Sequence, residues 1–402
     1  MADLPLHTPI VGIDNVSDDF SLAPGTVRDA TNVIIDRVGG VERRDGRALA
    51  LSGAFHSMWT DGSGRTYGVR AGVICRFELS GTAISYTPIE TAPAVSLPAP
   101  GPVRFDEHNG VVVACSRDGL FSIGSDGTAE ALSLPRPPAP SCVAGSSGGL
   151  HAGRYGVAVS WLRRSEEGPL SPSWFVDVGE GGGITASLPL DDPSGADGIR
   201  IYRTGPNGDV LMRAQDAPTS MSQYTIGAQD MGRAATNQHL EPMPGGEIVR
   251  HWRGRLLVAS GRVLMATQPM RYGLTDPRTD WVQFPARIDI MVALEGGVFV
   301  GTSDGVVFLD GATPNEWKQV RKSARRVLRG SDLRVRADLL GGEEPGDRWV
   351  AVWLAENGFV VGTPDGRLIE QQSKRIRLPD SETAAGVAAA VVHDRQIIAS
   401  IN

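Results

Sequence analysis

Runs of β-branched and aromatic residues, each interrupted by a glycine-containing turn, recur along this chain. The clearest copies read GVVVACSRDGLFSI from Gly110, GVFVGTSDGVVFLDG from Gly297 and GFVVGTPDGRLIE from Gly358. In each copy Asp-Gly separates two apolar runs, and this dipeptide favours a two-residue type I′ turn because both central positions need positive φ. Looser copies have Ala71-Gly72 and Ser260-Gly261 at the turn. The pattern therefore predicts a series of β-hairpins.

The spacing of these hairpins suggests how they are organised. Copies that begin at Arg255, Gly297 and Gly358 lie roughly 40 to 60 residues apart, and a four-stranded propeller blade takes about 40–50 residues. We therefore interpret the copies as inner hairpins of successive β-propeller blades, one of which holds an insertion. An ordinary β-sandwich with several hairpins is the alternative.

The middle of the chain has a different pattern, introduced by the proline-rich segment LPRPPAPSC from Leu134. Tyr155, Val157, Val159 and Trp161 alternate with smaller residues, which is typical of a half-buried strand. In GIRIYRT from Gly198 the alternation predicts inward isoleucines, with Arg200 and Arg203 in water. A fibronectin type III domain has about 100 residues with such patterning, so we expect a β-sandwich of this kind over 135–230.

The chain opens with a charged hairpin. A strand is expected over Thr31 to Asp36, a turn at Gly39-Gly40 and a second strand from Val41, which runs into ERRDGR. A two-stranded ribbon is marginal by itself in water, so this hairpin needs a partner. The C-terminal VVHDRQIIASIN is a candidate strand pair for it, as is a sheet edge of a neighbouring subunit.

Composition supports an all-β chain with many turns. The 402 residues include 50 Gly and 27 Pro, yet 41% of residues are hydrophobic, which is more than a disordered chain contains. We predict four segments: an arm over 1–47, first blades over 48–134, the sandwich over 135–230, and further blades with closing strands over 231–402. The few cysteines, Cys75, Cys115 and Cys142, are expected to be buried free thiols.

Net charge is −7, so the whole chain is not built to bind a polyanion. One basic segment, KQVRKSARRVLRGSDLRVR, stands out, and it is a candidate DNA-channel or intersubunit surface. We favour a solvated or intersubunit face, because a channel through which DNA slides should not hold phosphates tightly. Its basic residues are Lys318, Arg321, Lys322, Arg325, Arg326, Arg329, Arg334 and Arg336.

No catalytic or metal-binding motif is visible. The seven histidines form no His-x-x-x-His pair, and neither Gly-x-Ser-x-Gly nor a phosphate-binding loop occurs. We therefore expect no cofactor, no metal and no enzymatic activity, although paired carboxylates need only spatial proximity. The longest apolar run, near Ala384, is too short to span a bilayer, and no signal peptide is visible.

Taken in order along the chain, these phrases resemble a family of tailed-bacteriophage tail proteins. The members in question are the nozzle or head-to-tail stabilisation components. Their opening is similar to DATNVIIDRVGGVERRDGR, and their inserted module is similar to GRYGVAVSWLRRSEEGPLSPS. The blades that follow the module are similar to EIVRHWRGRLLVASGRVLMATQP. The resemblance covers most of the chain from Asn15 to Gly311.

The resemblance implies a structural role in the virion. It implies a β-propeller with an inserted sandwich, a homohexameric ring around the DNA channel, contacts with other tail or adaptor proteins, and genomic DNA passing without sequence-specific binding. Synthesis in the host cytoplasm is expected. A tail-tip or receptor-binding propeller is the alternative, with a polysaccharide-degrading enzyme as a further one. Fold alone does not fix function.

Overall fold

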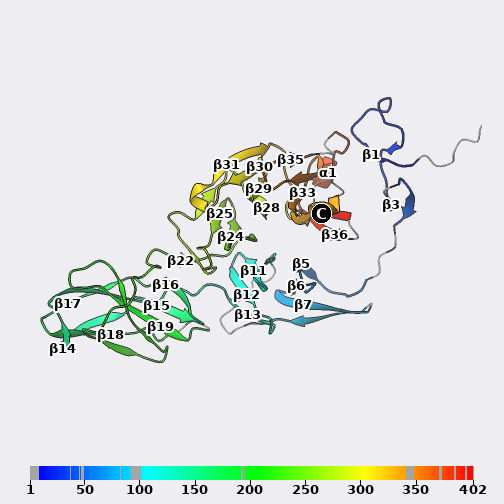
Figure 1. Cartoon of the computed structure of the whole chain (residues 1–402). Coiled ribbons are helices and arrows are strands. Elements are labelled where there is room, and N and C mark those ends of the chain that lie inside the picture. Colours follow the sequence, from blue (N-terminus) through cyan, green and yellow to red (C-terminus); the bar gives the residue numbers. More distant parts are fainter. Residues whose placement is uncertain are drawn as a thin grey trace, which may run out of the picture. The chain divides into compact units, whose positions relative to one another are not determined.

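The chain is built almost entirely of β-strands (Figure 1). The computed structural model describes residues 9–36, 38–44, 46, 49–81, 83–91, 101–191, 193, 195–340, 348–370, 374–383, 386–393 and 396–401. Within these residues, helical turns are limited to η1 (Pro314–Glu316), η2 (Ala337–Leu340) and α1 (Asp380–Thr383). The chain forms two compact units, one of residues 53–283 and one that combines residues 1–52 with 284–402.

The unit of residues 53–283 contains three antiparallel meanders besides the insertion. The first contains β5 (Phe55–Thr60), β6 (Thr66–Arg70), β7 (Val73–Ser80) and β8 (Ala83–Pro88). The second contains β10 (Arg104–His108), β11 (Val111–Ser116), β12 (Gly119–Ile123) and β13 (Thr128–Ala131), with β9 (Glu90–Thr91) alongside β13. The third contains β23 (Ile248–Trp252), β24 (Arg255–Ser260), β25 (Val263–Ala266) and β27 (Trp281–Gln283), and a short pair joins β22 (Glu241–Pro242) to β26 (Leu274–Thr275).

The other unit contains two further meanders and three two-stranded sheets in the part of the chain that the structure describes. The meanders are β28 (Ile288–Leu294), β29 (Gly297–Thr302), β30 (Gly305–Asp310) and β31 (Lys318–Ser323), then β32 (Leu333–Arg336), β33 (Trp349–Ala355), β34 (Gly358–Gly362) and β35 (Leu368–Ile369). The small sheets pair β1 (Gly12–Ile13) with β2 (Thr26–Val27), β3 (Val33–Ile35) with β4 (Val41–Arg43), and β36 (Ala388–His393) with β37 (Gln396–Ile401).

Each meander connects consecutive strands antiparallel, which is the blade unit of a β-propeller. Within each unit, apolar residues of neighbouring meanders pack on one another. In the first pair of sheets the rings of Trp59 and Phe105 stack at 5.9 Å between centroids, over a core that includes Val69 and Val112. The predicted all-β fold with propeller-type blades is therefore confirmed.

The hairpins lie where the sequence predicts them, but the Asp-Gly pairs do not form type I′ turns. Ser116 pairs with Gly119 and Thr302 with Gly305, so these glycines already belong to strands and the loop residues come before them. Positive φ at both loop positions is found at the predicted turn Ala71-Gly72, and also at Asn109-Gly110 and Arg253-Gly254. These pairs join strands of the same sheets, and their glycines relieve the strain that a Cβ would add.

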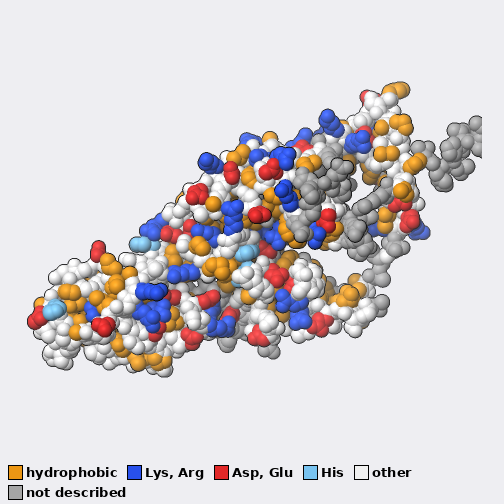
Figure 2. Space-filling view, viewed as in Figure 1, with side chains coloured by type: hydrophobic (Ala, Val, Ile, Leu, Met, Phe, Trp, Pro, Cys, Tyr) orange, Lys and Arg blue, Asp and Glu red, His pale blue; other side chains and the backbone are white. Residues whose placement is uncertain are grey.

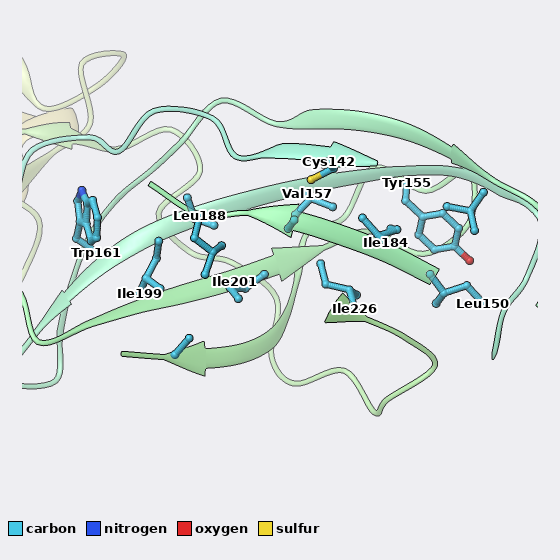
Figure 3. Close-up of a cluster of buried hydrophobic side chains, with 14 of the residues drawn as sticks. Cys142, Leu150, Tyr155, Val157, Trp161, Ile184, Leu188, Ile199, Ile201 and Ile226 are labelled. Atoms are coloured by element: carbon cyan, nitrogen blue, oxygen red, sulfur yellow. The ribbon is translucent and has the colours of Figure 1, made fainter. Parts of the chain in front are cut away.

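The insertion is a sandwich of two sheets around its own core (Figure 3). One sheet holds β14 (Ser141–Leu150), β18 (Gly182–Ser187) and β21 (Gln223–Ile226). The other holds β16 (Glu166–Leu170), β15 (Gly153–Arg163), β19 (Gly198–Arg203) and β20 (Met212–Ala217), with β17 (Trp174–Val178) also paired to β15. Tyr155, Val157, Trp161, Ile184 and Ile201 fill the space between the sheets, as the alternating pattern predicts.

Two details of this alternation are wrong. β15 is buried on both faces, because Ala158 on its outer face packs with Tyr202, Leu211 and the later Ala235. Arg203 is only 5% exposed, since it lies on the same face of β19 as Ile199 and Ile201. Burial lowers the pKa of Arg203 from its ordinary value.

The cysteines follow the prediction. Cys75, Cys115 and Cys142 are buried free thiols. Burial raises the pKa of Cys115 to about 12 and that of Cys142 to about 11, so both thiols stay protonated at neutral pH. Such thiols are inert, because the thiolate is the reactive form.

Candidate functional site

The basic segment of residues 318–336 does not form one continuous face. Its first part is β31, the edge strand of one sheet, and its last part is β32, the first strand of the next. On β31, Arg321 donates to the carbonyl oxygen of Asp304 at 3.0 Å, and the Lys322 ammonium lies 5.6 Å from the ring centre of Phe308. β31 is exposed along most of its length, so its basic side chains are accessible to another molecule.

Two of the later basic residues have acidic partners close by. Arg325 lies 3.6 Å from Glu370 and 4.0 Å from Glu356, and Arg336 pairs with Asp338 at 3.2 Å. Figure 2 shows lysine and arginine side chains interspersed with aspartate and glutamate on the face drawn. Half of the eight basic residues thus make local ion pairs or cation–π contacts. A surface ion pair contributes about 0–1 kcal/mol to stability.

Arg334 and its neighbours on β32 face opposite sides of the strand. Its guanidinium lies 4.8 Å from the ring centre of Trp349, while Leu333 and Val335 turn inward to the core of the sheet. Arg329 pairs through its backbone with residues 386 and 388, and Arg326 and Lys318 stand on exposed positions. These placements concern the surface alone and identify no bound molecule.

The N-terminal arm, residues 9–44, contains the predicted hairpin. Val33–Ile35 pairs antiparallel with Val41–Arg43, and Gly39 has φ +84 at the turn. Asp45 and Arg47, the last charges of the predicted hairpin, lie outside the described residues. Large apolar side chains are exposed along the arm, with Val38 exposed to 81%; the others are Val11, Val16, Phe20, Ile34 and Val41.

One cluster was not found from the sequence. His108 at the end of β10 lies against Tyr272, with 4.0 Å between ring centroids, and 5.9 Å from the ring of His251 on β23. His108 is only 7% exposed, and neither of its ring nitrogens has a hydrogen-bond partner in the described residues. Asp106 accepts the backbone N–H of His251 at 2.5 Å, which ties the two strands together.

The electrostatics of this cluster keep His108 neutral. Burial, and then the charge of His251, lowers the pKa of His108 to about 4, while Asp106 acts weakly in the other direction. Burial raises the pKa of Tyr272. The sequence signal was a histidine shortly before an X-Gly turn in both strands, at Asn109-Gly110 and at Arg253-Gly254.

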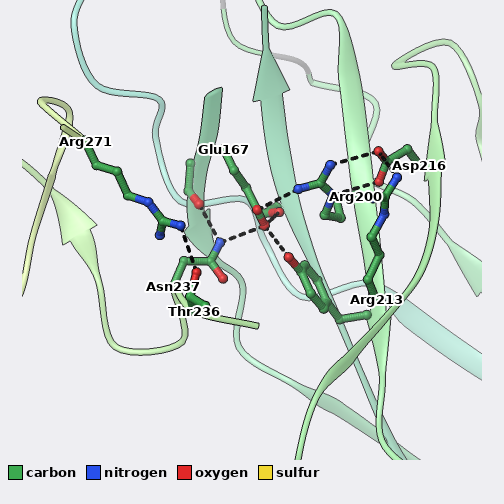
Figure 4. A network of polar contacts seen from close by, with 10 residues as sticks. Glu167, Arg200, Arg213, Asp216, Thr236, Asn237 and Arg271 are labelled. Carbon is green, nitrogen blue, oxygen red and sulfur yellow. Dashed lines mark hydrogen bonds and ion pairs between the residues drawn. The ribbon is translucent and has the colours of Figure 1, made fainter. Parts of the chain in front are cut away.

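A second polar cluster joins the insertion to the segment that follows it (Figure 4). Glu167 accepts hydrogen bonds from Tyr202 at 2.6 Å, Arg200 at 2.8 Å and Asn237 at 2.9 Å. Arg200 also binds Asp216 through two contacts of 2.8 and 2.9 Å. Burial raises the pKa of Asp216, but hydrogen bonding to Arg200 and its charge outweigh burial, so this pKa lies below its ordinary value.

Arg163 provides a further connection between the insertion and a preceding sheet. Its side chain is only 4% exposed and donates to the carbonyl oxygens of Ala131 at 2.6 Å and Leu132 at 2.9 Å. Its neighbour Arg164 binds Glu130 at 2.8 Å. The insertion is thus held by specific polar contacts as well as by its two chain connections.

In the part of the chain that the structure describes, no group of three or more His, Cys, Asp or Glu side chains could hold a metal ion. No helix among those residues is long and apolar enough to cross a membrane.

No family model matches the chain, and no curated protein matches it. Among solved structures, the chain is similar to the extracellular domain of a candidate one component system from B. thetaiotaomicron. The two sequences are 11% identical, the match covers 92% of this chain and 43% of that chain, and the TM-score is 0.32. A candidate 6-phosphogluconolactonase from Bacteroides fragilis has 12% identity, coverage of 85% and 88%, and a TM-score of 0.33. Virginiamycin B lyase from Staphylococcus aureus has 11% identity, coverage of 78% and 83%, and a TM-score of 0.28.

These comparisons correct one expectation. The prediction that the chain is not an enzyme is wrong as a conclusion from sequence, because the similar structures include a lyase and a candidate lactonase. At such identities and TM-scores the likeness assigns no activity to this chain. It spans less than half of the first of these structures, the extracellular domain.

Proposed function

We propose that this chain is a structural subunit of a bacteriophage tail, several copies of which form a nozzle-like ring around the DNA channel. The observation that carries the proposal is the N-terminal arm, which exposes apolar side chains such as Phe20 and Val38. Contiguous exposed apolar surface is typical of a site that another chain covers. The tail setting rests on the resemblance of the sequence phrases.

The charge distribution supports assembly through the arm. Between Asp14 and Asp36 the arm has five aspartates and the single basic residue Arg28, whereas β31 contributes Lys318, Arg321 and Lys322 on an exposed edge. Opposite charges on two surfaces favour their encounter and fix their relative register. The acidic stretch of residues 14–36 from one copy and the basic edge from the next would complement each other, and a net charge of −7 would leave DNA free to slide.

The test is averaged electron micrographs of intact tails in which this chain is located by a small tag. We expect six copies around a channel that is wide enough for duplex DNA. A Val38→Asp, Val41→Asp double variant should be absent from tails while its circular dichroism is unchanged. The control is Leu79→Asp, a change at a comparably exposed apolar residue on β7, which should be incorporated normally. A single copy, or three copies at a fibre tip, would contradict the proposal.

A second function is favoured by one specific observation, an exposed aromatic pair on the insertion. Trp174 and Phe175 on β17 are 44% and 53% exposed, and the guanidinium of Arg154 lies 4.8 Å from the ring centre of Phe175. Exposed aromatic residues beside arginine are common at binding hot spots. A host-surface receptor at the tail tip is the partner for this alternative, and a Trp174→Ala, Phe175→Ala variant should then lose binding to host cells without losing its fold.

A further inference from the structure

The five blade-type meanders have four meander strands each, whereas the last sheet along the described chain has two. Among the described residues, β36 and β37 pair only with each other as a ladder. The start of β36 is bridged to Arg329, whose carbonyl accepts the N–H of Ala388 at 2.9 Å. β37 has no such neighbour within the residues described.

This half-sheet is otherwise an integrated part of the fold. Ala388, Ile397, Ala399 and Ile401 turn one face of it toward the core beside β32–β35. On the other face Val391 is 55% exposed, opposite Ile398 in the ladder. The strands read AAAVVH and QIIASI, without one charged residue. Native proteins protect open edges with charge, proline or a covering element, so an uncharged apolar edge indicates that something pairs with it.

The sequence of this chain contains a second two-stranded ribbon that could complete the β36–β37 half-sheet. β3 reads VII and is uncharged, whereas β4 reads VER and is followed by Arg44. The β3–β4 ribbon also lacks further ladder partners in the part of the chain that the structure describes. If β3 joins β37, the order β36-β37-β3-β4 gives a four-stranded sheet with the apolar strands inside. The charged β4 then occupies the outer edge, where charge blocks further pairing.

We propose that the β3–β4 ribbon of a second copy of this chain docks on β37 and completes the β36–β37 half-sheet. Within the described residues the ribbon does not pair with β37 of its own chain, and its turn is bonded instead to residue 10, since Ile10 donates to the carbonyl oxygen of Gly39 at 3.0 Å. Strand addition of this kind gains main-chain hydrogen bonds and buries alternate side chains. The inference deepens the proposed function, on which it rests, by naming the interface that joins neighbouring subunits.

The experiment is disulfide trapping between two differently sized full-length chains. One has Ile34→Cys in β3 and the other, enlarged by a fused tag, has Ile398→Cys in β37. The native thiols give little background, because all three are buried. We expect a reducible product with the summed mass of both chains, at a yield at least about tenfold above that of a Leu79→Cys control mixed with the Ile398→Cys chain, since paired strands raise the local thiol concentration. Ile35→Cys repeats the test for the other face of β3.

Each result has a defined reading. A chain that has both Ile34→Cys and Ile398→Cys but forms only an internal disulfide would show that the ribbon closes its own half-sheet, which overturns the proposal. Yields equal to the control, with folding verified by circular dichroism, overturn it too. If wild-type tails contain a six-copy ring and no cross-linked product forms in either mixture, only the strand pairing fails. If the ring is absent as well, the proposed function fails with it.

Discussion

Asn15 and Arg377 are 362 residues apart in the sequence, yet they hydrogen-bond in both directions. The side-chain amide of Asn15 donates to the carbonyl oxygen of Arg377 at 2.9 Å, and its oxygen accepts the Arg377 N–H at 2.8 Å. The backbone N–H of Asn15 also donates to the carbonyl oxygen of Arg375 at 2.8 Å. The Asn15 side chain thus donates to and accepts from one backbone residue, as a paired strand residue does. These bonds attach the arm to the segment before the C-terminal hairpin.

Replacing Asn15 should release the arm without unfolding the blades. Asn15→Ala removes both side-chain hydrogen bonds, each of which contributes about 0.5–1.5 kcal/mol, and the site is exposed. We expect faster proteolytic cleavage within residues 16–32 and an unchanged midpoint of thermal unfolding. Asn15→Asp retains the acceptor and loses the donor, so it should give an intermediate rate. Equal cleavage rates in all three proteins would show that this contact does not hold the arm.

His108 should make stability depend on pH. Its folded pKa is lowered to about 4 from an ordinary 6.5, so below pH 6.5 the unfolded chain binds a proton that the folded chain does not. The stabilisation is therefore fully present above pH 6.5 and is lost as pH falls toward 4, by an amount on the order of 3 kcal/mol. Urea unfolding between pH 7 and 4 should show this loss for the wild type.

The matched variants are His108→Phe and His151→Phe. Phenylalanine at position 108 cannot be protonated, so the slope of unfolding free energy against pH should become shallower. His151 is exposed and its pair with Glu180 lies at the surface, so its replacement should change the slope by much less. If the wild type and His108→Phe have the same slope, the neutral buried state of His108 is not the source of the pH dependence.

Glu167 should be the most sensitive member of its network. It is the shared acceptor for Tyr202, Arg200 and Asn237, and removing one partner of a buried polar cluster leaves the others unsatisfied. We expect Glu167→Ala to lower the free energy of unfolding by about 3–5 kcal/mol. Arg213→Ala removes a more exposed contact to Asp216 and should cost no more than about 1 kcal/mol. Chemical denaturation measures both, and similar losses would contradict the central position of Glu167.

Deleting the insertion should leave the remaining sheets folded. Residues 135–230 have their own core, and joining residues 134 and 231 by a short Gly-Ser linker frees the carbonyl oxygens of Ala131 and Leu132 from Arg163 to water. The truncated protein should stay soluble with a β-type circular dichroism spectrum. Full-length Arg163→Met is the companion variant and should unfold in two separable calorimetric steps. An unfolded truncation would place the insertion within the folding core of the blades.

Local patterns accounted for much of the fold. The alternation of Tyr155, Val157 and Trp161 predicted an inward face, and the hairpin around Gly39 formed as expected. The same reasoning misplaced Arg203, because a period of two puts residue 203 on the face of Ile199 and Ile201 whatever its charge. A second covering layer, which includes Ala235, buried the face of β15 that was expected to be wet.

The sequence by itself determined the positions of the hairpins and the inward residues of the sandwich core, because side-chain alternation and glycine conformations act between near neighbours. Only the tertiary structure decided that His108 is neutral between β10 and β23, that Glu167 accepts from Ser160, Arg200, Tyr202 and Asn237, and that the last sheet of the described chain has two strands. Such features depend on residues far apart along the chain: the contact between Asp106 and His251 spans 145 positions. Burial and pairing at that distance are set by how whole sheets pack, which no short sequence pattern encodes.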